Sequence, residues 1–182
     1  MRKLVAFLLL VLFTLTACGP QPTVKHFEND GIAFDYPASW RSMSEVFGAE
    51  YLDDNFRGFG MQEIVAITSM KKKGQFGAYF NVATRPLPAG QNLEDTYRQA
   101  YQDYFNINRS SREISEDTIA VDGITALRKI YQSPVGEPWW DYVDIWLEKD
   151  GVIYLLSFHC LLNTLEHHEQ DLQTILNAFH VK

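Results

Sequence analysis

Alternation of apolar and polar positions along the chain predicts a protein built mainly of β-strands. Side chains on a strand point alternately to its two faces, so a two-residue period indicates strands. Asp122-Gly123 and Asp150-Gly151 are the Asp-Gly pairs that favour two-residue hairpin turns between strands. The pattern predicts strands at 31–36, 63–70, 78–85, 113–121, 124–132, 139–149 and 152–161.

Two segments have the three- and four-residue spacing of amphipathic helices instead. The first is 92–105, where Asn92 is in the position of an N-cap and Asp95 follows three residues later. The second is 165–179, with Asn163 or Thr164 as its cap. The predicted buried positions are Leu93, Tyr97, Ala100, Tyr101 and Tyr104 in the first helix, and Leu165, Leu172, Ile175, Leu176 and Phe179 in the second.

The last two strands, 139–149 and 152–161, carry apolar side chains on both faces. A sheet with one face in water would show a cleaner division between apolar and polar positions. Both faces therefore need cover, and the sequence supplies two amphipathic helices. We expect an α+β fold: a three-layer α/β/α sandwich whose mainly antiparallel sheet is flanked by helices.

The amino terminus combines a basic start, Met1-Arg2-Lys3, with an apolar run over 4–15. Such a run suits a secretory signal and is shorter than the ~20 residues of a membrane span. The following Leu15-Thr16-Ala17-Cys18 resembles a bacterial lipobox. This resemblance implies that 1–17 is a lipoprotein signal peptide and that Cys18 becomes the acylated first mature residue. A plain signal peptide with a chance cysteine is the alternative.

Acylation at Cys18 would anchor the protein on the outer side of a cell membrane or outer membrane, since two or more acyl chains hold a protein firmly. Residues 18–25 then form a lipidated tether. The formal charge is -7, and removal of Arg2 and Lys3 would leave -9. We therefore expect the folded body to be repelled by anionic headgroups. The same negative balance argues against a nucleic-acid partner.

Two stretches resemble PsbP-like domains. Residues 27–40 read Phe-Glu-Asn-Asp-Gly-Ile-Ala-Phe-Asp-Tyr-Pro-Ala-Ser-Trp, and the chain closes with a strand near Ser157-Phe158 and a helix over 175–179. The superfamily includes photosystem-associated PsbP proteins, Ran-binding Mog-type proteins and DcrB-type lipoproteins. The resemblance implies a PsbP-like domain over 26–182 that binds or assembles partners, without catalysis and without a cofactor. Tyr36, Pro37 and Trp40 would determine the fold.

Candidate catalytic and metal-binding residues are few. His159, His167 and His168 lie near acidic residues, but the four-residue spacing of zincin histidines is absent. There is no Gly-x-Ser-x-Gly motif, and Asp141 and Asp144 fall on opposite faces of one strand. We predict no metal site and no enzyme; a metal-dependent enzyme using His159 and His167 is an alternative. With Cys18 acylated, Cys160 is expected to be a buried thiol.

Aromatic side chains gather at Trp139, Trp140, Tyr142 and Trp146. Tryptophan and tyrosine often anchor interfaces, so these residues are the candidate partner-binding site; the alternative is that the rings fill the core. A carrier of a small apolar ligand would instead show an unfilled aromatic cavity near Trp146. The basic hairpin tip at 71–73 is either solvated or in contact with anionic lipid.

Together these observations predict a membrane-anchored lipoprotein. Its non-catalytic PsbP-like domain would bind or help assemble a partner protein at the cell envelope. The identity of that partner is not encoded in any motif.

Overall fold

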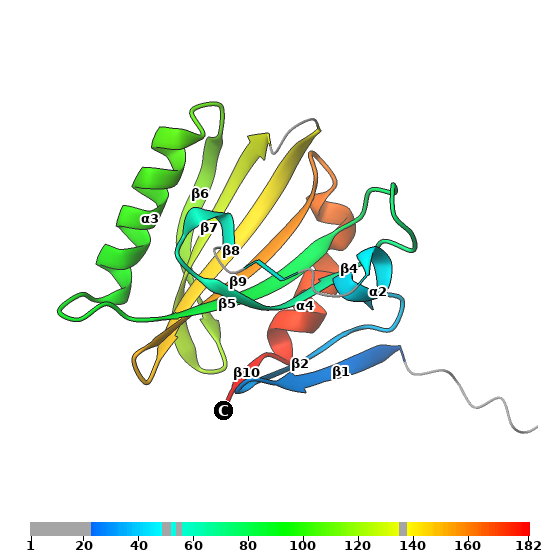
Figure 1. Cartoon of the computed structure of the whole chain (residues 1–182), viewed down its shortest axis with the longest axis horizontal. Coiled ribbons are helices and arrows are strands. Elements are labelled where there is room, and N and C mark those ends of the chain that lie inside the picture. Colours follow the sequence, from blue (N-terminus) through cyan, green and yellow to red (C-terminus); the bar gives the residue numbers. More distant parts are fainter. Residues whose placement is uncertain (1–22, 49–51, 54–55, 135–137) are drawn as a thin grey trace, which may run out of the picture.

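A computed structural model describes residues 23–48, 52–53, 56–134 and 138–182 of the chain. The described part contains a seven-stranded antiparallel sheet in the order β3-β4-β5-β9-β8-β7-β6 (Figure 1). Its strands are β3 (Arg41–Ser42), β4 (Gln62–Thr68), β5 (Tyr79–Pro86), β6 (Arg112–Val121), β7 (Ile124–Pro134), β8 (Trp139–Lys149) and β9 (Val152–Leu161).

A second, three-stranded sheet has the order β1-β2-β10 and joins the two ends of the described chain. Its strands are β1 (Val24–Asn29), β2 (Ile32–Pro37) and β10 (His180–Val181). The helical elements are α2 (Met43–Phe47), η1 (Phe56–Gly58), α3 (Leu93–Ile107), η2 (Leu165–His168) and α4 (Glu169–Asn177).

Asp-Gly turns connect three of the hairpins. Asp122 and Asp150 have φ of 52° and 54°, and the glycine after each also has positive φ. This left-handed pair is the geometry of the turns that match the twist of a hairpin. Both predicted turns are confirmed, and Asp30-Gly31 makes a third of the same kind between β1 and β2.

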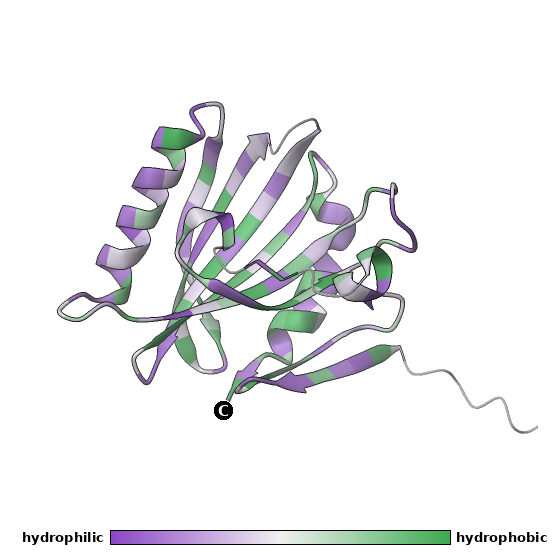
Figure 2. Ribbon diagram, in the orientation of Figure 1, coloured by the Kyte–Doolittle hydropathy of each residue, from purple (hydrophilic) through white to green (hydrophobic). Residues whose placement is uncertain are grey.

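One face of the large sheet, here called the α4 face, packs against α4 and the small sheet. Phe158 of β9 and Ile145 of β8 lie in this core with Ile175 of α4 and Phe34 of β2. Phe34 also meets Phe80 of β5 edge to face, at 5.3 Å between ring centroids. Figure 2 shows green and purple segments alternating along the strands, the pattern expected when successive side chains point to opposite faces.

The opposite face, here called the α3 face, packs against α3 and η1. Tyr97, Tyr101 and Tyr104 of α3 contact a second core that includes Trp146 of β8. The helix begins where predicted, because the Asn92 side chain accepts a hydrogen bond of 2.8 Å from the Asp95 backbone N–H. The α+β class and the mainly antiparallel sheets thus agree with the sequence-based expectation.

Three local predictions differ from the structure. The strand over 31–36 belongs to the small sheet, where β1, which was not predicted, pairs with it. β1 begins at Val24, so two residues assigned to the tether are in a strand. The last helix starts as the 3-10 turn η2, without a side-chain cap; the Thr164 hydroxyl donates backwards to the Leu161 carbonyl at 2.7 Å instead.

Cys18 and the predicted signal peptide lie outside the described residues. Among the helices of the described part, none has the length and apolar character needed to cross a membrane.

Candidate functional site

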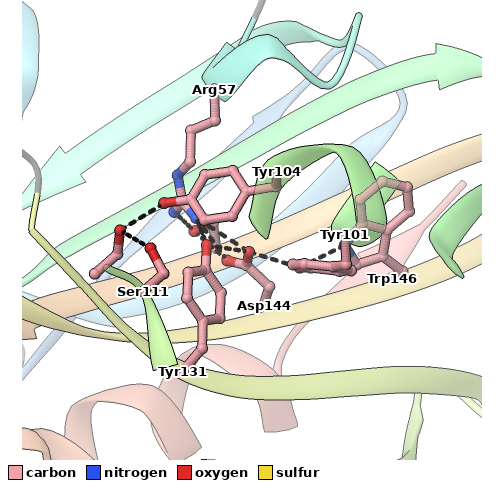
Figure 3. Close-up of polar contacts among 9 residues, drawn as sticks. Arg57, Tyr101, Tyr104, Ser111, Tyr131, Asp144 and Trp146 are labelled. Carbon is pink, nitrogen blue, oxygen red and sulfur yellow. Dashed lines mark hydrogen bonds and ion pairs between the residues drawn. The ribbon is translucent and has the colours of Figure 1, made fainter. Parts of the chain in front are cut away.

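A buried ion pair lies at the centre of the α3 face. Asp144 of β8 has a fully buried side chain, and the Arg57 side chain from η1 retains 12% exposure. Arg57 Nη1 donates to both carboxylate oxygens of Asp144, at 3.0 Å and 3.2 Å. Figure 3 shows the guanidinium reaching from η1 down to this carboxylate. The pair therefore fastens η1 to the sheet.

Neighbouring hydroxyl groups complete the coordination of Asp144. Tyr101 and Tyr131 donate to one carboxylate oxygen at 2.7 Å and 2.9 Å, and Ser157 donates to the other at 2.6 Å. Trp146 donates in turn to the Tyr101 hydroxyl at 3.1 Å (Figure 3). Because a buried carboxylate is costly unless it is paired and hydrogen-bonded, this complete set of donors explains how Asp144 is tolerated.

The position of Arg57 is fixed by its backbone and by ring contacts. Its φ is +50°, an unusual value for a residue other than glycine, and its guanidinium carbon lies 4.3 Å from the centroid of the Tyr142 ring. Burial by itself would lower the pKa of Arg57, but Asp144 together with the neighbouring tyrosines Tyr131, Tyr142 and Tyr104 outweighs burial and raises the pKa above its usual value. Arg57 therefore stays charged and holds η1 against the sheet through its ion pair with Asp144.

A groove of about 670 Å³ opens beside this ion pair. Its volume falls within the ~300–1,000 Å³ typical of small-molecule sites. Side chains from α2, η1 and the strands β4, β5, β8 and β9 form its walls. The lining residues are Met43, Phe47, Leu52, Asp53, Phe56, Arg57, Glu63, Tyr79, Asn81, Trp140, Tyr142 and His159.

Two buried polar side chains line the groove, Asn81 at 6% exposure and Glu63 at 4%. Asn81 Nδ2 donates to a Glu63 carboxylate oxygen, and the other oxygen accepts from the Asp53 backbone N–H at 3.0 Å. Burial raises the pKa of Glu63 despite these two donors. The Asn81 Oδ1 atom is buried without a hydrogen-bond partner, so the groove holds an acceptor that a ligand could satisfy.

His159 lies in a stack of rings in the same groove. Its ring is parallel to Tyr79, with centroids 4.7 Å apart, and lies 5.2 Å from Tyr142 on β8. Burial and the charge of Arg57 lower the pKa of His159 well below its ordinary value, so the ring is neutral at pH 7. Its Nδ1 atom is buried and has no hydrogen-bond partner.

The margin of the groove is aromatic. Trp140 meets Tyr79 edge to face at 5.5 Å and Phe76 at 6.2 Å. Phe76 is 62% exposed. Leu52, which lines the groove, is 53% exposed. Exposed apolar side chains of this size at the edge of a concavity are typical of a binding surface.

The four predicted partner-binding aromatic residues divide into two groups. Trp146 is fully buried and Tyr142 is 3% exposed, so both rings are part of the α3-face core. Trp139 and Trp140 are partly exposed, and Trp139 stacks with the Arg112 guanidinium at 5.1 Å. The candidate surface therefore narrows to Trp139 and Trp140, because a side chain packed under a helix cannot reach a partner.

The aromatic cavity expected near Trp146 for a ligand carrier is at a different place. Phe59, Tyr97 and Tyr101 surround the Trp146 ring, with centroids 5.6–5.9 Å away. The groove is lined instead by Trp140, six residues before Trp146 on β8. The expected cavity near Trp146 is therefore absent from the described structure, because side chains of α3 fill the space over the Trp146 ring.

The structure does not assemble a metal centre from the predicted histidines. His159 lines the groove, whereas His167 is exposed in η2. No group of three His, Cys, Asp or Glu side chains within the described ranges is placed to hold a metal ion. Cys160 is buried in the α4-face core, and burial raises its thiol pKa to about 11, so the thiol is unreactive at neutral pH.

Sequence reasoning missed Arg57, Glu63 and Asn81. Arg57 lies in a segment without hydrophobic periodicity, and its partner Asp144 is 87 residues away. Glu63 and Asn81 are polar residues at buried positions of the strands β4 and β5. In the sequence, a polar residue within a mostly apolar strand could have indicated them.

The model of the family described as PsbP-like protein matches residues 17–181. The chain belongs to this family, whose members are generally non-catalytic. A search of curated protein sequences gives no match.

Solved structures with the same fold come from distant organisms. The solution structure of cyanobacterial PsbP, CyanoP, from Synechocystis sp. PCC 6803 is 17% identical with a TM-score of 0.60, covering 93% of this chain and 99% of that one. The Ran-binding protein Mog1p of Saccharomyces cerevisiae is 14% identical at 0.56, covering 87% and 95%. LpqN of Mycobacterium tuberculosis, involved in cell envelope biogenesis, is 10% identical at 0.56, covering 90% and 99%.

Proposed function

We propose that this chain is a lipoprotein held on the outer side of a membrane by acylated Cys18, and that its PsbP-like domain binds or helps assemble a partner protein at the cell envelope. The proposal includes the three-layer arrangement of the domain, with α3 and α4 on opposite sides of the large sheet. It also treats the domain as non-catalytic, in keeping with its family.

The groove next to Trp140 is the observation that carries the binding role. It combines an exposed aromatic edge, at Trp140 and Phe76, with a buried acceptor on Asn81 that has no partner. Aromatic anchors supply buried area, while a buried polar group left unpaired costs ~1–3 kcal/mol, which a donor from a ligand can recover. A protein segment with an apolar side chain beside a backbone N–H would satisfy both.

Two structural neighbours support the choice of partner class. Mog1p is described as Ran-binding, and LpqN as involved in cell envelope biogenesis. The lipobox at 15–18 supports an envelope location for this chain. These are separate lines of support for binding and for location.

Site-specific photocrosslinking in intact cells tests the binding role. A photoreactive amino acid placed at Leu52 or Trp140, both of which line the groove, should capture one and the same protein. The matched control site is Thr125, an exposed residue beside the Asp122 turn at the far end of the sheet. Capture of that same protein at Thr125 with equal yield would contradict the assignment.

Substitution at the groove margin provides the second control. Trp140→Ala should abolish the capture while the unfolding transition remains cooperative. If Trp140→Ala unfolds the domain, Leu52→Ala gives the same test, because Leu52 lines the groove and is already 53% exposed.

Location is tested independently of binding. The mature amino terminus should be an acylated Cys18 by mass spectrometry, and Cys18→Ser should release the protein from the membrane fraction. An unmodified thiol on a mature protein free in the medium would overturn the anchoring part of the proposal.

The volume of the groove favours a second function, the transport of a small amphipathic ligand. At about 670 Å³ the groove can hold such a molecule, and Asn81 Oδ1 and His159 Nδ1 are buried polar atoms without a hydrogen-bond partner in the described structure. Native mass spectrometry of protein purified from its own cells would show a bound small molecule that Trp140→Ala loses. Protein captured at the groove without such a ligand supports the first function.

A further inference from the structure

The end of the large sheet from which the predicted tether leaves carries a basic tip. Lys71, Lys72 and Lys73 are consecutive and exposed in the loop between β4 and β5, and Phe76 in the same loop is 62% exposed. Figure 2 shows this loop as a hydrophilic projection from the sheet. The segment 71–76, here called the basic tip, therefore combines three cations with one exposed ring.

Strand pairing places the start of β1 at the same end. Val24 pairs with Pro37, and Arg41, a few residues further along, pairs with Thr68, where the basic tip loop begins. Lys25 Nζ donates to the Trp40 carbonyl at 3.0 Å, which closes the connection across this end. Figure 1 shows the start of β1 and the β4–β5 loop on the same side of the molecule. A membrane anchor at Cys18, six positions before Val24, is thus attached next to the basic tip.

The opposite end of the molecule is acidic. Asp30, Asp122 and Asp150 occupy the three Asp-Gly turns there and are exposed. The turns are close together, because Asp122 Oδ2 accepts from the Val181 backbone N–H at 3.0 Å and Lys182 donates its backbone N–H to Gly31 at 2.8 Å. The two ends of the sheet therefore carry opposite charge at their turns.

The acidic turns are too far from the basic tip to affect the electrostatic potential there. β9 has 10 residues, which at ~3.3 Å per residue puts about 30 Å between the two ends of the sheet. That length is several times the screening length of ~8 Å at physiological salt. The net charge, -7 for the full chain and -9 once Arg2 and Lys3 are removed, consequently does not govern the potential at the basic tip, although Glu45 on α2 and Glu166 on η2 belong to the same end.

We propose that the basic tip docks on anionic lipid headgroups of the membrane that holds the Cys18 anchor. The lysines contact the headgroups and Phe76 enters the interface between headgroups and acyl chains. Each basic residue near an anionic surface strengthens association by about fivefold, so three lysines next to an anchor are enough to favour the docked orientation. Docking turns the acidic turns away from the membrane and holds the groove margin at Trp140 close to the membrane surface.

This inference rests on the proposed anchoring through Cys18 and specifies the orientation of the anchored domain. The test uses the full lipidated protein reconstituted in vesicles. Gln75→Cys is labelled with an environment-sensitive fluorophore, and Thr125→Cys at the acidic end is the matched control. The label is confined to the new thiol, because Cys160 is buried and Cys18 is acylated.

In vesicles with about 30% phosphatidylglycerol, we expect a blue shift at position 75 and quenching by spin-labelled lipids, and neither at position 125. In pure phosphatidylcholine both positions should report water. Lys71→Glu/Lys72→Glu/Lys73→Glu should lower the docked population at least tenfold, and Phe76→Ser should reduce quenching while leaving a salt-sensitive fraction. The substituted residues are exposed, so the unfolding midpoints serve as the check that all variants remain folded.

Flotation of the vesicles in high salt separates this inference from the proposed function. A protein that does not float contradicts the anchoring itself. A protein that floats while position 75 reports water in both kinds of vesicle overturns the docking alone, as does an unchanged signal in the triple-lysine variant. A requirement for envelope protein rather than lipid would also appear as a water-exposed position 75, since these vesicles contain lipid only.

Discussion

The two faces of the large sheet are buried in different ways. Phe158 and His159 are consecutive residues of β9 that point to opposite faces. Phe158 is fully buried among aliphatic and aromatic side chains of the α4 face, whereas His159 stacks among tyrosines near the Arg57–Asp144 pair. The core of the α4 face is formed by apolar side chains, whereas the core of the α3 face also contains a buried ion pair. On the α4 face, the loss of stability caused by a substitution should therefore scale with the apolar area removed. On the α3 face, it should depend on whether the substitution breaks the Arg57–Asp144 pair.

The largest expected effect is on the α4 face. Phe158→Ala removes a fully buried ring that contacts Trp40 at 6.1 Å between centroids, and Phe→Ala in a core costs about 3–5 kcal/mol through lost transfer energy and the cavity left behind. Urea unfolding followed by fluorescence measures the change in the free energy of unfolding. Phe76→Ala, on an exposed ring, is the control and should change it by less than about 0.5 kcal/mol. Equal effects would mean that the ring at 158 is not in a close-packed core.

The next effect is on the α3 face and depends on the partner. Asp144→Asn leaves the Arg57 charge without its counter-charge, and breaking such a pair costs about 3–5 kcal/mol when both groups are buried. The 12% exposure that Arg57 retains places the expected loss near the lower limit.

The double variant Arg57→Met/Asp144→Asn sharpens this prediction. Removing both charges should recover much of the loss, because the unpaired buried charge is then gone. Urea unfolding of the wild type, both single variants and the double variant gives the coupling energy. Strictly additive losses would mean that Arg57 and Asp144 do not interact.

A smaller effect is expected at the start of the helix that covers the α3 face. Asn92→Ala removes the side chain that caps α3 and should cost about 1 kcal/mol of unfolding free energy. The control is Gln99→Ala, at an exposed position of the same helix, which should stay within about 0.5 kcal/mol of the wild type. A loss at Gln99 as large as that at Asn92 would contradict the role of the cap.

The smallest effect is a dependence on pH from His159. Its pKa is lowered in the folded protein, so protonation favours the unfolded chain as pH falls below the ordinary histidine value of about 6.5. Between pH 7.5 and pH 5 the wild type should lose more stability than His159→Phe, by under about 1 kcal/mol because the ring keeps some exposure. Urea midpoints across this range measure the difference. A greater loss in the variant would mean that the histidine is charged in the folded state.

Sequence periodicity predicted the apolar face better than the polar one. The alternation in 139–149 and 152–161 placed Val143, Ile145 and Leu147 on one face, and the structure packs them in the α4-face core. These positions follow from the local strand geometry alone. The same alternation placed Asp144 on the other face but could not supply its partner.

The polar elements of the α3 face depend on contacts between distant segments. Arg57 follows no hydrophobic period, and its side chain reaches Asp144 because the chain between β3 and β4 places η1 over the α3 face. Likewise the groove combines Asn81 and His159 from two strands that pair in the register Asn81 with Ser157 and Tyr79 with His159. Register and crossing paths are tertiary properties, which explains why composition identified the aromatic residues but not the concavity they border.

The small sheet has a consequence for the order in which the chain becomes structured. β2 lies between β1, near the start of the described chain, and β10, at its end. Asp122 and Lys149 hold β10 in place through bonds to the Val181 backbone at 3.0 Å and 2.6 Å. During synthesis, Ile32 and Ala33 are made long before Val181 and His180, their neighbours in the sheet. The small sheet can therefore be completed only after the last residues of the described chain have been made, although two of its three strands are the first to appear.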